Sequence, residues 1–237
     1  MKAVTFFLGF APLLLIGLSG AAAKPPANLL NAERRMLAND YAKCIAAKHP
    51  ELVREYVLQA GNSRQRDDRF RKLTDWKCMP SSSSREVTSL HFSSSSARYT
   101  FAEFLLKNEK IFVFHDFGAV PLLQHPEPKK MEDYKPSGRI SKGSYARMVE
   151  KSFGEAAMSR IGECVVRADT GNSIKLLETA VEGTEEMATI QLLLPVAGRC
   201  IENGSIRIKP EQLRGTIALN LYRLTAVALP TETKPNA

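Results

Sequence analysis

Apolar residues recur along the chain with the 3.6-residue period of a helix that buries one face. In the second half, such a face is formed by Phe153, Ala157, Ile161, Cys164 and Val165. The pattern predicts an amphipathic helix that carries a cysteine on its apolar side.

The first half repeats this arrangement. Its apolar face is formed by Leu30, Leu37, Tyr41, Cys44 and Ile45. Each half is therefore predicted to open with a cysteine-bearing helix.

Further helices are predicted in both halves. A second helix begins at Pro50, which suits a first helical turn, and stops at Gly61. A third covers about residues 66–77 in the first half and 185–197 in the second half. A fourth is opened by Pro210 in the second half. The apolar positions of the fourth helices are Phe101, Phe104 and Leu105, and Leu213, Ile217, Leu221 and Leu224.

Short alternating segments at 90–92 and 206–208 predict one β-strand in each half. Serine runs at 81–84 and 93–96 are typical of loops. The apolar segment 111–114 predicts a buried strand or loop. The rest of 108–150, rich in proline, lysine and glycine, is predicted to be a linker. The polar tail from residue 230 is predicted to be disordered.

The N-terminus has the three parts of a secretory signal peptide. Lys2 supplies positive charge, residues 6–18 form an apolar run broken by two glycines and a proline, and an alanine triplet at 21–23 offers a cleavage site. A permanent anchor is the alternative, because the run approaches the spanning length of about 20 residues. The helix breakers and the triplet favour cleavage after Ala23 and a periplasmic or secreted protein.

An even number of cysteines in an exported chain predicts disulfide bonds. No pair has the C-x-x-C spacing of a zinc or thioredoxin-type redox site, and no metal or cofactor is predicted. Four cysteines allow three connectivities. We predict Cys44–Cys78 and Cys164–Cys200, with sequence separations of 34 and 36 residues, because this pairing respects the similarity of the two halves.

The cysteine spacing is part of a wider self-similarity. Gly61 and Gly183 both lie 17 residues before the second cysteine of their half, and at an offset of 116 Arg98 falls on Arg214. A chance alignment with gaps is the alternative to an ancient duplication, which we favour. The predicted fold is mostly α, with two tandem, pseudo-equivalent, disulfide-stapled helical units and short strands. The predicted divisions are a signal peptide over 1–23, unit one over 24–107, a linker over 108–150, unit two over 151–229 and a tail over 230–237.

Charge is unevenly distributed along the chain. The formal net charge of +8 falls to +7 when Lys2 is removed. Residues 24–107 contain 15 basic and 9 acidic side chains, whereas residues 158–237 contain 9 of each. Such a basic surface can bind an anionic envelope component; simple solubility is the alternative.

Five arginines are candidates for anion binding. Three of them lie in a cluster interleaved with Asp67 and Asp68, which can neutralise it on a helix face. The other two occupy equivalent places on the fourth helices, where a structural partner inside each unit is the alternative. No aromatic residues alternate with the basic cluster as in nucleic-acid stacking surfaces. The candidates are Arg64, Arg66, Arg69, Arg98 and Arg214.

Three segments of the second half, IGECVVRAD, LLLPVAGRC and LRGTIALNLYRL, resemble a group of uncharacterised exported proteins from sphingomonad-type alphaproteobacteria. The resemblance covers residues 153–224 well. The first half departs from it, because Cys44 lies in the different context YAKCI. The resemblance implies a periplasmic location and carries no activity.

Two classes of function remain. We favour a non-enzymatic periplasmic interaction or envelope-associated protein, because no motif for catalysis is present and a duplicated scaffold can present a groove. The alternative is a periplasmic hydrolase with a site near His115, which with Asp116 forms the only adjacent histidine–acid pair. The isolated histidines His49, His91 and His125 are predicted to be surface or helix-end residues.

Overall fold

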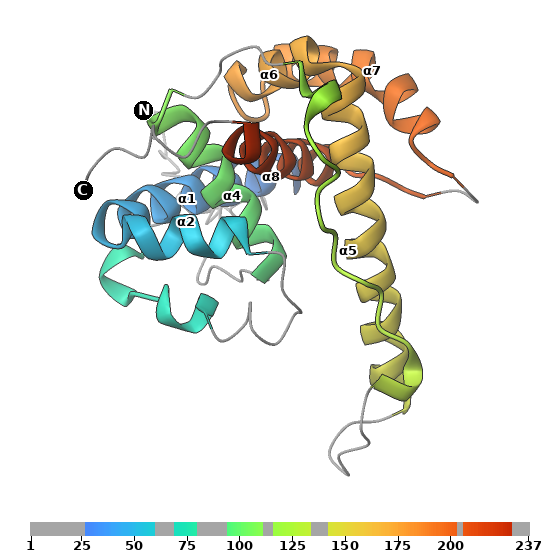
Figure 1. Ribbon diagram of the computed structural model, residues 1–237. Helices are drawn as coiled ribbons and strands as arrows, with labels where there is room; N and C mark the ends of the chain where they lie inside the picture. The colour runs from blue at the N-terminus through green and yellow to red at the C-terminus, as the bar shows by residue number, and fades with distance from the viewer. Residues whose placement is uncertain are drawn as a thin grey trace, which may run out of the picture.

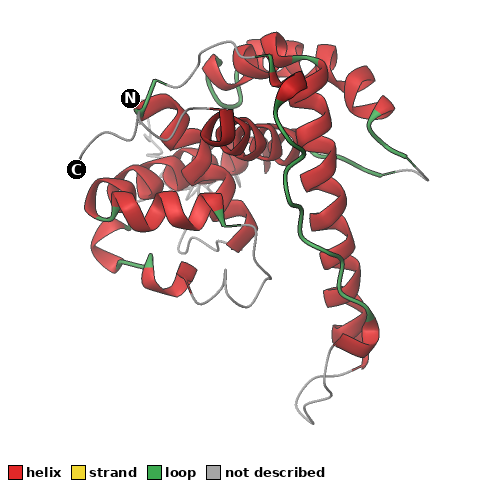
Figure 2. Ribbon diagram, viewed as in Figure 1, coloured by secondary structure: helices red, strands yellow, loops and turns green. Residues whose placement is uncertain are grey.

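The computed structural model describes residues 27–59, 69–79, 94–110, 116–133, 142–202 and 206–228. Within these ranges the chain is mostly helical, as predicted, and contains no β-strand (Figures 1 and 2). The first half contains α1 (Ala27–Lys48), α2 (Pro50–Leu58), the 3-10 turn η1 (Trp76–Cys78) and α4 (Ser94–Asn108). Next come η2 (Phe117–Ala119), η3 (Met131–Asp133), α5 (Lys142–Ala168), α6 (Thr170–Glu178), α7 (Thr184–Arg199) and α8 (Pro210–Ala228).

A long helix followed at once by a nine-residue helix occurs twice. A single residue, His49, separates α1 from α2, and a single residue, Asp169, separates α5 from α6. Pro50 suits the start of α2, because its missing N–H would be unpaired there in any case. Asp169 caps α6 by accepting a hydrogen bond from the backbone N–H of Asn172 at 3.0 Å. The chain therefore turns sharply at both places.

Helix α8 lies at the centre of the molecule (Figure 1). Every residue from Leu213 to Thr225 is buried. The helix packs against α4 on one side and α5 on another, and it also contacts α2, α6 and α7. One continuous hydrophobic core therefore includes residues of both halves, such as Ile45 and Phe101 from the first and Leu193 and Ile217 from the second.

Two glycines allow these helices to approach closely. A Cβ atom added to Gly162 of α5 would lie 2.5 Å from the Thr216 hydroxyl oxygen and 2.8 Å from the Thr216 carbonyl oxygen of α8. A Cβ atom added to Gly215 of α8 would lie 2.6 Å from the Tyr99 ring of α4. No side chain fits at either position without movement of the backbone or of a packed ring.

Residues 116–133, here called the strap, run beside α5 (Figure 1). Arg167 of α5 donates to the carbonyl oxygens of Phe117, Val120 and Pro121. Near the other end, the Ser152 hydroxyl of α5 accepts from the Lys129 N–H at 2.9 Å. The prediction of a linker over 108–150 is therefore wrong for the strap, and also for residues 142–150, which belong to α5.

Several local predictions need correction. Residues 206–208 form no strand; Ile206 and Ile208 instead pack against the core, and none of the described residues offers a strand to pair with them. Of the described part of the third predicted helix of the first half, residues 69–72 are helical, residues 73–75 are not, and residues 76–77 belong to η1. Residues 94–96 form the first turn of α4 rather than a loop. Phe153 is 50 % exposed, since it lies on the part of α5 that extends away from the other helices (Figure 1).

Several other predicted features lie outside the described residues. They are the signal peptide over 1–23, the loop at 81–84, the strand at 90–92, the apolar segment 111–114 and the tail from 230.

Candidate functional site

The structure contains two disulfides, and they have the predicted pairing within each half. Cys44 is bonded to Cys78 and Cys164 to Cys200, with Cα–Cα distances of 5.5 Å and 5.8 Å. Disulfides of this kind persist in oxidising compartments. The chain is therefore suited to an extracytoplasmic location.

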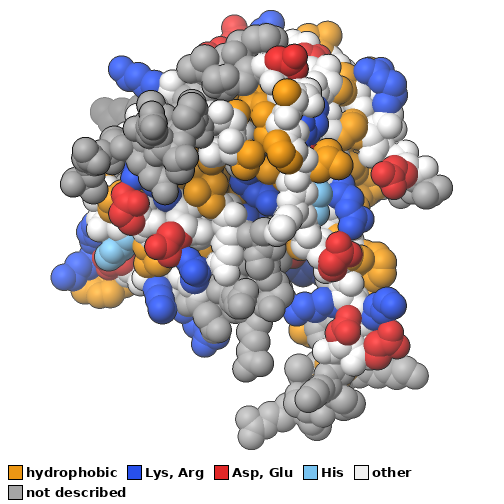
Figure 3. All heavy atoms as spheres, in the orientation of Figure 1, with side chains coloured by type: hydrophobic (Ala, Val, Ile, Leu, Met, Phe, Trp, Pro, Cys, Tyr) orange, Lys and Arg blue, Asp and Glu red, His pale blue; other side chains and the backbone are white. Residues whose placement is uncertain are grey.

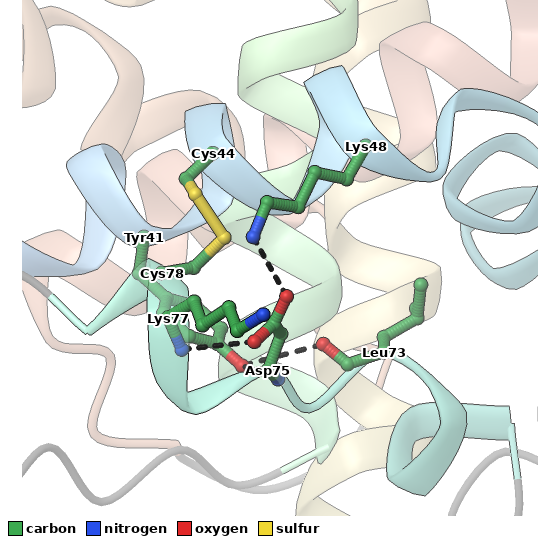
Figure 4. The surroundings of a disulfide bond; sticks show 7 residues. All are labelled: Tyr41, Cys44, Lys48, Leu73, Asp75, Lys77 and Cys78. Carbon is green, nitrogen blue, oxygen red and sulfur yellow. Dashed lines mark hydrogen bonds and ion pairs between the residues drawn. A yellow bond between two sulfur atoms is a disulfide. The ribbon is translucent and has the colours of Figure 1, made fainter.

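The first disulfide fixes a short turn on the surface of α1 (Figure 4). Asp75 caps η1 by accepting from the Lys77 N–H at 2.8 Å, and its other carboxylate oxygen lies 2.8 Å from the Lys48 ammonium of α1. The Tyr41 hydroxyl of α1 donates to the Leu73 carbonyl oxygen at 3.3 Å. One covalent bond and these polar contacts therefore hold the turn in place.

The residues attached to this turn, 69–79, form what we call the basic segment. They include four cationic side chains and one acidic side chain, whereas residues 27–58 of α1 and α2 include five cationic and four acidic ones. The cationic excess of the described part of the first half is thus concentrated in the basic segment. Figure 3 shows lysine and arginine side chains on the face where α2 and this segment lie, with acidic side chains among them.

Two large apolar side chains project from the basic segment. Trp76, the single tryptophan of the chain, is 79 % exposed, and Met79 is 46 % exposed. The Lys77 ammonium lies 6.0 Å from the centroid of the Trp76 ring, at the limit of a cation–π contact. The segment therefore combines apolar and cationic groups at one exposed turn.

The single acidic residue of the segment does not cancel its charge completely. A hydrogen bond from Lys48 and one from the Lys77 N–H lower the pKa of Asp75, so Asp75 stays ionised and neutralises Lys48. Lys72 and Lys77 of the segment are exposed, as is Lys43 of α1. Of these, Lys77 is the cation that lies by the Trp76 ring.

The structure separates the five predicted anion-binding arginines. Arg69 forms an exposed ion pair with Glu55 at 2.5 Å, while Arg64 and Arg66 lie outside the described residues. Arg98 and Arg214 are only 4 % and 1 % exposed. The anion-binding prediction is wrong for these last two, because their guanidinium groups are buried and bonded to protein oxygens.

Arg98 and Arg214 have structural partners instead. Arg98 donates to the carbonyl oxygens of Val57 and Gln59 at the end of α2. Arg214 donates to the carbonyl oxygens of Leu176, Leu177 and Thr179 at the end of α6. Both arginines thus satisfy carbonyl groups that a helix terminus leaves unpaired.

Arg214 also joins two buried carboxylates. It lies 2.7 Å from Glu103 of α4 and 3.1 Å from Glu186 of α7. Burial alone would raise the pKa of Glu103, but the hydrogen bond and charge of Arg214 outweigh it, and the pKa is lowered. Arg35 of α1 pairs with the same Glu186 at 2.7 Å. This network is a structural link among four helices.

A second polar cluster was not predicted from the sequence. His125 of the strap contacts the Ser159 hydroxyl through Nδ1 at 2.8 Å and the Glu163 carboxylate through Nε2 at 2.5 Å. Glu163 also accepts from the Leu123 N–H and pairs with Arg167. Burial lowers the pKa of His125 and outweighs the opposing effect of Glu163. The four-residue spacing of Ser159 and Glu163 places them on one helix face, but no local signal brings His125 to them.

Serine, histidine and glutamate are the residue types of a hydrolytic triad, but their arrangement here fits a clamp. Ser159 is 6 % exposed and lies within α5, so its hydroxyl is not open to a substrate. The three groups fix the strap on α5. His115, the centre of the predicted hydrolase site, lies outside the described residues.

The described residues contain no group of three or more histidine, cysteine, aspartate or glutamate residues arranged to hold a metal ion. None of the helices within the described ranges combines the length and apolar character needed to cross a membrane.

Comparisons with known proteins give no identity: no protein-family model, no curated protein and no solved structure matches the chain.

Proposed function

We propose that this chain is a non-enzymatic, envelope-associated exported protein that binds an anionic partner through the basic segment. The observation that carries the proposal is the exposed Trp76 in a cation-rich segment, with the Lys77 ammonium 6.0 Å from its ring, on a turn that the Cys44–Cys78 disulfide fixes to α1. Because the turn is held in place, little conformational entropy is lost when a partner binds to it.

A periplasmic location is part of the proposal. The two disulfides support it, since they need an oxidising compartment. The signal peptide proposed for residues 1–23, with cleavage after Ala23, would deliver the chain there.

We also propose that the two halves arose by duplication. Residues Val53, Tyr56 and Val57 are the buried positions of α2, and at an offset of 120 they correspond to buried residues of α6. The same offset relates the first cysteines of the two halves. Arg98 and Arg214 bond to the ends of these two helices. Aligned on the second cysteines, the counterpart of the basic segment is 191–201, which has one cationic side chain, Arg199, against four in the basic segment. Anion binding is therefore assigned to the first half.

The test is charge reversal in the basic segment. The mature, oxidised protein should be retained on an immobilised sulfated polysaccharide and released by salt, because exposed charge pairs are screened. Lys72→Glu with Lys77→Glu should elute at clearly lower salt. Arg207→Glu with Lys209→Glu, both exposed in the second half, changes the net charge equally and should elute close to the wild type. Equal shifts for the two double variants would refute binding through the basic segment.

The alternative of a hydrolase near His115 concerns a residue outside the described ranges and stays a prediction.

A further inference from the structure

We infer that the anionic partner is the headgroup surface of a phospholipid bilayer, which Trp76 and Met79 enter while the neighbouring lysines contact lipid phosphates. This inference rests on the proposed function and names its partner. Two properties of the basic segment support it: the apolar side chains at its tip and the placement of its cations.

The first property is the pair of exposed apolar side chains. Trp76 is 79 % exposed and Met79 is 46 % exposed, although they lie two residues before and one residue after the buried Cys78. An indole ring has an apolar body and a polar N–H, and it is favoured where water meets hydrocarbon. A hydrated polyanion would satisfy the lysines but would leave the Met79 thioether in water. A bilayer surface provides phosphates for the cations and an apolar layer just below them for Trp76 and Met79.

The second property is the set of exposed cations in the segment and on the adjoining α1. The Lys77 ammonium lies 6.0 Å from the Trp76 ring centroid, Lys72 is exposed four residues earlier, and Lys43 is exposed on α1 beside Cys44. A lysine side chain can lie along an apolar surface while its ammonium reaches a phosphate. The lysines can therefore bind headgroups while the ring enters the interface, and clusters of this kind favour anionic leaflets.

The geometry also explains how a short turn, rather than a helix, can present the membrane-binding side chains. The Trp76 side chain belongs to η1, which the Cys44–Cys78 bond and the Lys48–Asp75 pair hold against α1. The tip is therefore presented by a rigid support, and the helical core need not rearrange on binding.

The chain contains a single tryptophan, so tryptophan emission, excited at a wavelength that tyrosine does not absorb, reports on position 76 alone. The experiment adds vesicles of phosphatidylglycerol and phosphatidylcholine, or of phosphatidylcholine alone, to the mature, oxidised protein. With anionic vesicles we expect a blue shift of the emission and protection of Trp76 from aqueous quenchers. Both effects should be lost at high salt, because the Debye length falls from about 10 Å at 0.1 M to about 3 Å at 1 M. Phosphatidylcholine alone should cause neither effect.

Vesicle co-sedimentation of variants provides a second readout. Trp76→Ala should weaken binding to anionic vesicles roughly tenfold or more, and Lys72→Glu with Lys77→Glu should abolish it. Leu192→Ala, at a side chain 56 % exposed on α7, and Arg207→Glu with Lys209→Glu are the controls and should bind like the wild type. Circular dichroism and disulfide mapping verify that each variant is folded.

The outcomes separate this inference from the proposed function. Retention on the polysaccharide through the basic segment, without binding to vesicles, would refute the bilayer as the partner and leave the proposed function standing. Vesicle binding with an unshifted Trp76 emission, or equal binding by Trp76→Ala, would also overturn it. If the basic segment binds neither probe, both the inference and the proposed function fall. A salt-sensitive blue shift on anionic vesicles that depends on Trp76 and the lysines would establish it.

Discussion

Arg98 and Arg214 are the fifth residues of α4 and α8, and each directs its guanidinium group to the C-terminal end of a nine-residue helix. Arg98 donates to backbone carbonyls, and Arg214 donates to backbone carbonyls and also bonds to Glu103 and Glu186. The Arg214 site therefore joins two buried carboxylates to the end of a helix.

Arg214→Met should destabilise the protein more than Arg98→Met. The first change leaves two buried carboxylates without their shared cation and should cost about 3–5 kcal/mol. The second leaves carbonyl groups unpaired at the end of α2 and should cost about 1–3 kcal/mol. The measurement is the free energy of unfolding in urea at pH 7. Equal losses would contradict the central role assigned to Arg214.

His125 makes stability depend on pH. The Glu163 carboxylate can only accept, so the neutral ring carries its hydrogen on Nε2, and Nδ1 accepts from the Ser159 hydroxyl. Burial lowers the pKa of His125 below its ordinary value of 6.5. Between the folded-state pKa of His125 and its ordinary value, the unfolded chain binds more protons than the folded one. Stability contributed by the neutral ring is thus present above pH 6.5 and is lost as the pH falls through the folded-state pKa.

The corresponding experiment measures unfolding free energy from pH 7.5 to pH 5. The wild type should lose stability over the lower part of this range more steeply than His125→Gln. His49→Gln, which changes an exposed histidine, is the control and should keep the wild-type slope. If His125→Gln and the wild type have parallel profiles, the histidine does not control the pH response.

Helix α5 shows how one element serves several contacts. Cys164 ties it to the end of α7, Gly162 lets it approach α8, and Ser152, Glu163 and Arg167 hold the strap. These residues lie on different sides of the helix because 3.6 residues complete a turn. The part of α5 before residue 156 has fewer buried positions, which agrees with its extension beyond the core.

A pair of glycine variants on α5 tests the close approach to α8. Gly162→Ala places a Cβ atom 2.5 Å from the Thr216 and Asn220 side chains and should destabilise the protein by about 1–3 kcal/mol. Gly154→Ala meets nothing within 4 Å and should stabilise it by about 0.4–1 kcal/mol. Thermal and urea unfolding give both values. Stabilisation by Gly162→Ala would show that the two helices are not in contact at this point.

The two halves do not form separate bodies, because α8 of the second half packs against α4 of the first half. The core residues of both halves belong to one continuous cluster. The Arg35–Glu186 and Arg214–Glu103 pairs add polar links across the same boundary. Cooperative unfolding of the whole molecule follows from this shared core.

Removing the first disulfide should therefore weaken the entire molecule. Cys44→Ser with Cys78→Ser opens a loop with a sequence separation of 34 residues and should lower the unfolding free energy by roughly 3–4 kcal/mol in the chain-entropy model. Cys164→Ser with Cys200→Ser should have a similar effect. Far-ultraviolet circular dichroism and calorimetry should each show one transition. A separate early transition of one half would indicate two independently stable units.

The sequence by itself determined the features that depend on local spacing. The period of apolar residues located α1, α5 and α8, Pro50 and Pro210 marked the starts of two helices, and similar spacing in the two halves indicated the cysteine pairing. These signals act within a few residues, or compare one half with the other. The prediction of strands failed at 206–208, since alternation alone does not supply a partner strand.

Only the tertiary structure decided which distant groups meet. Arg214 and Glu103 are 111 residues apart, and His125 and Glu163 are 38 residues apart. Their pairing depends on how α4, α5, α8 and the strap pack against one another. The period of apolar residues does not specify that packing. The same packing buried two arginines that the sequence offered as anion ligands. It left Trp76 exposed, whereas Cys78 of the same turn is buried in the core.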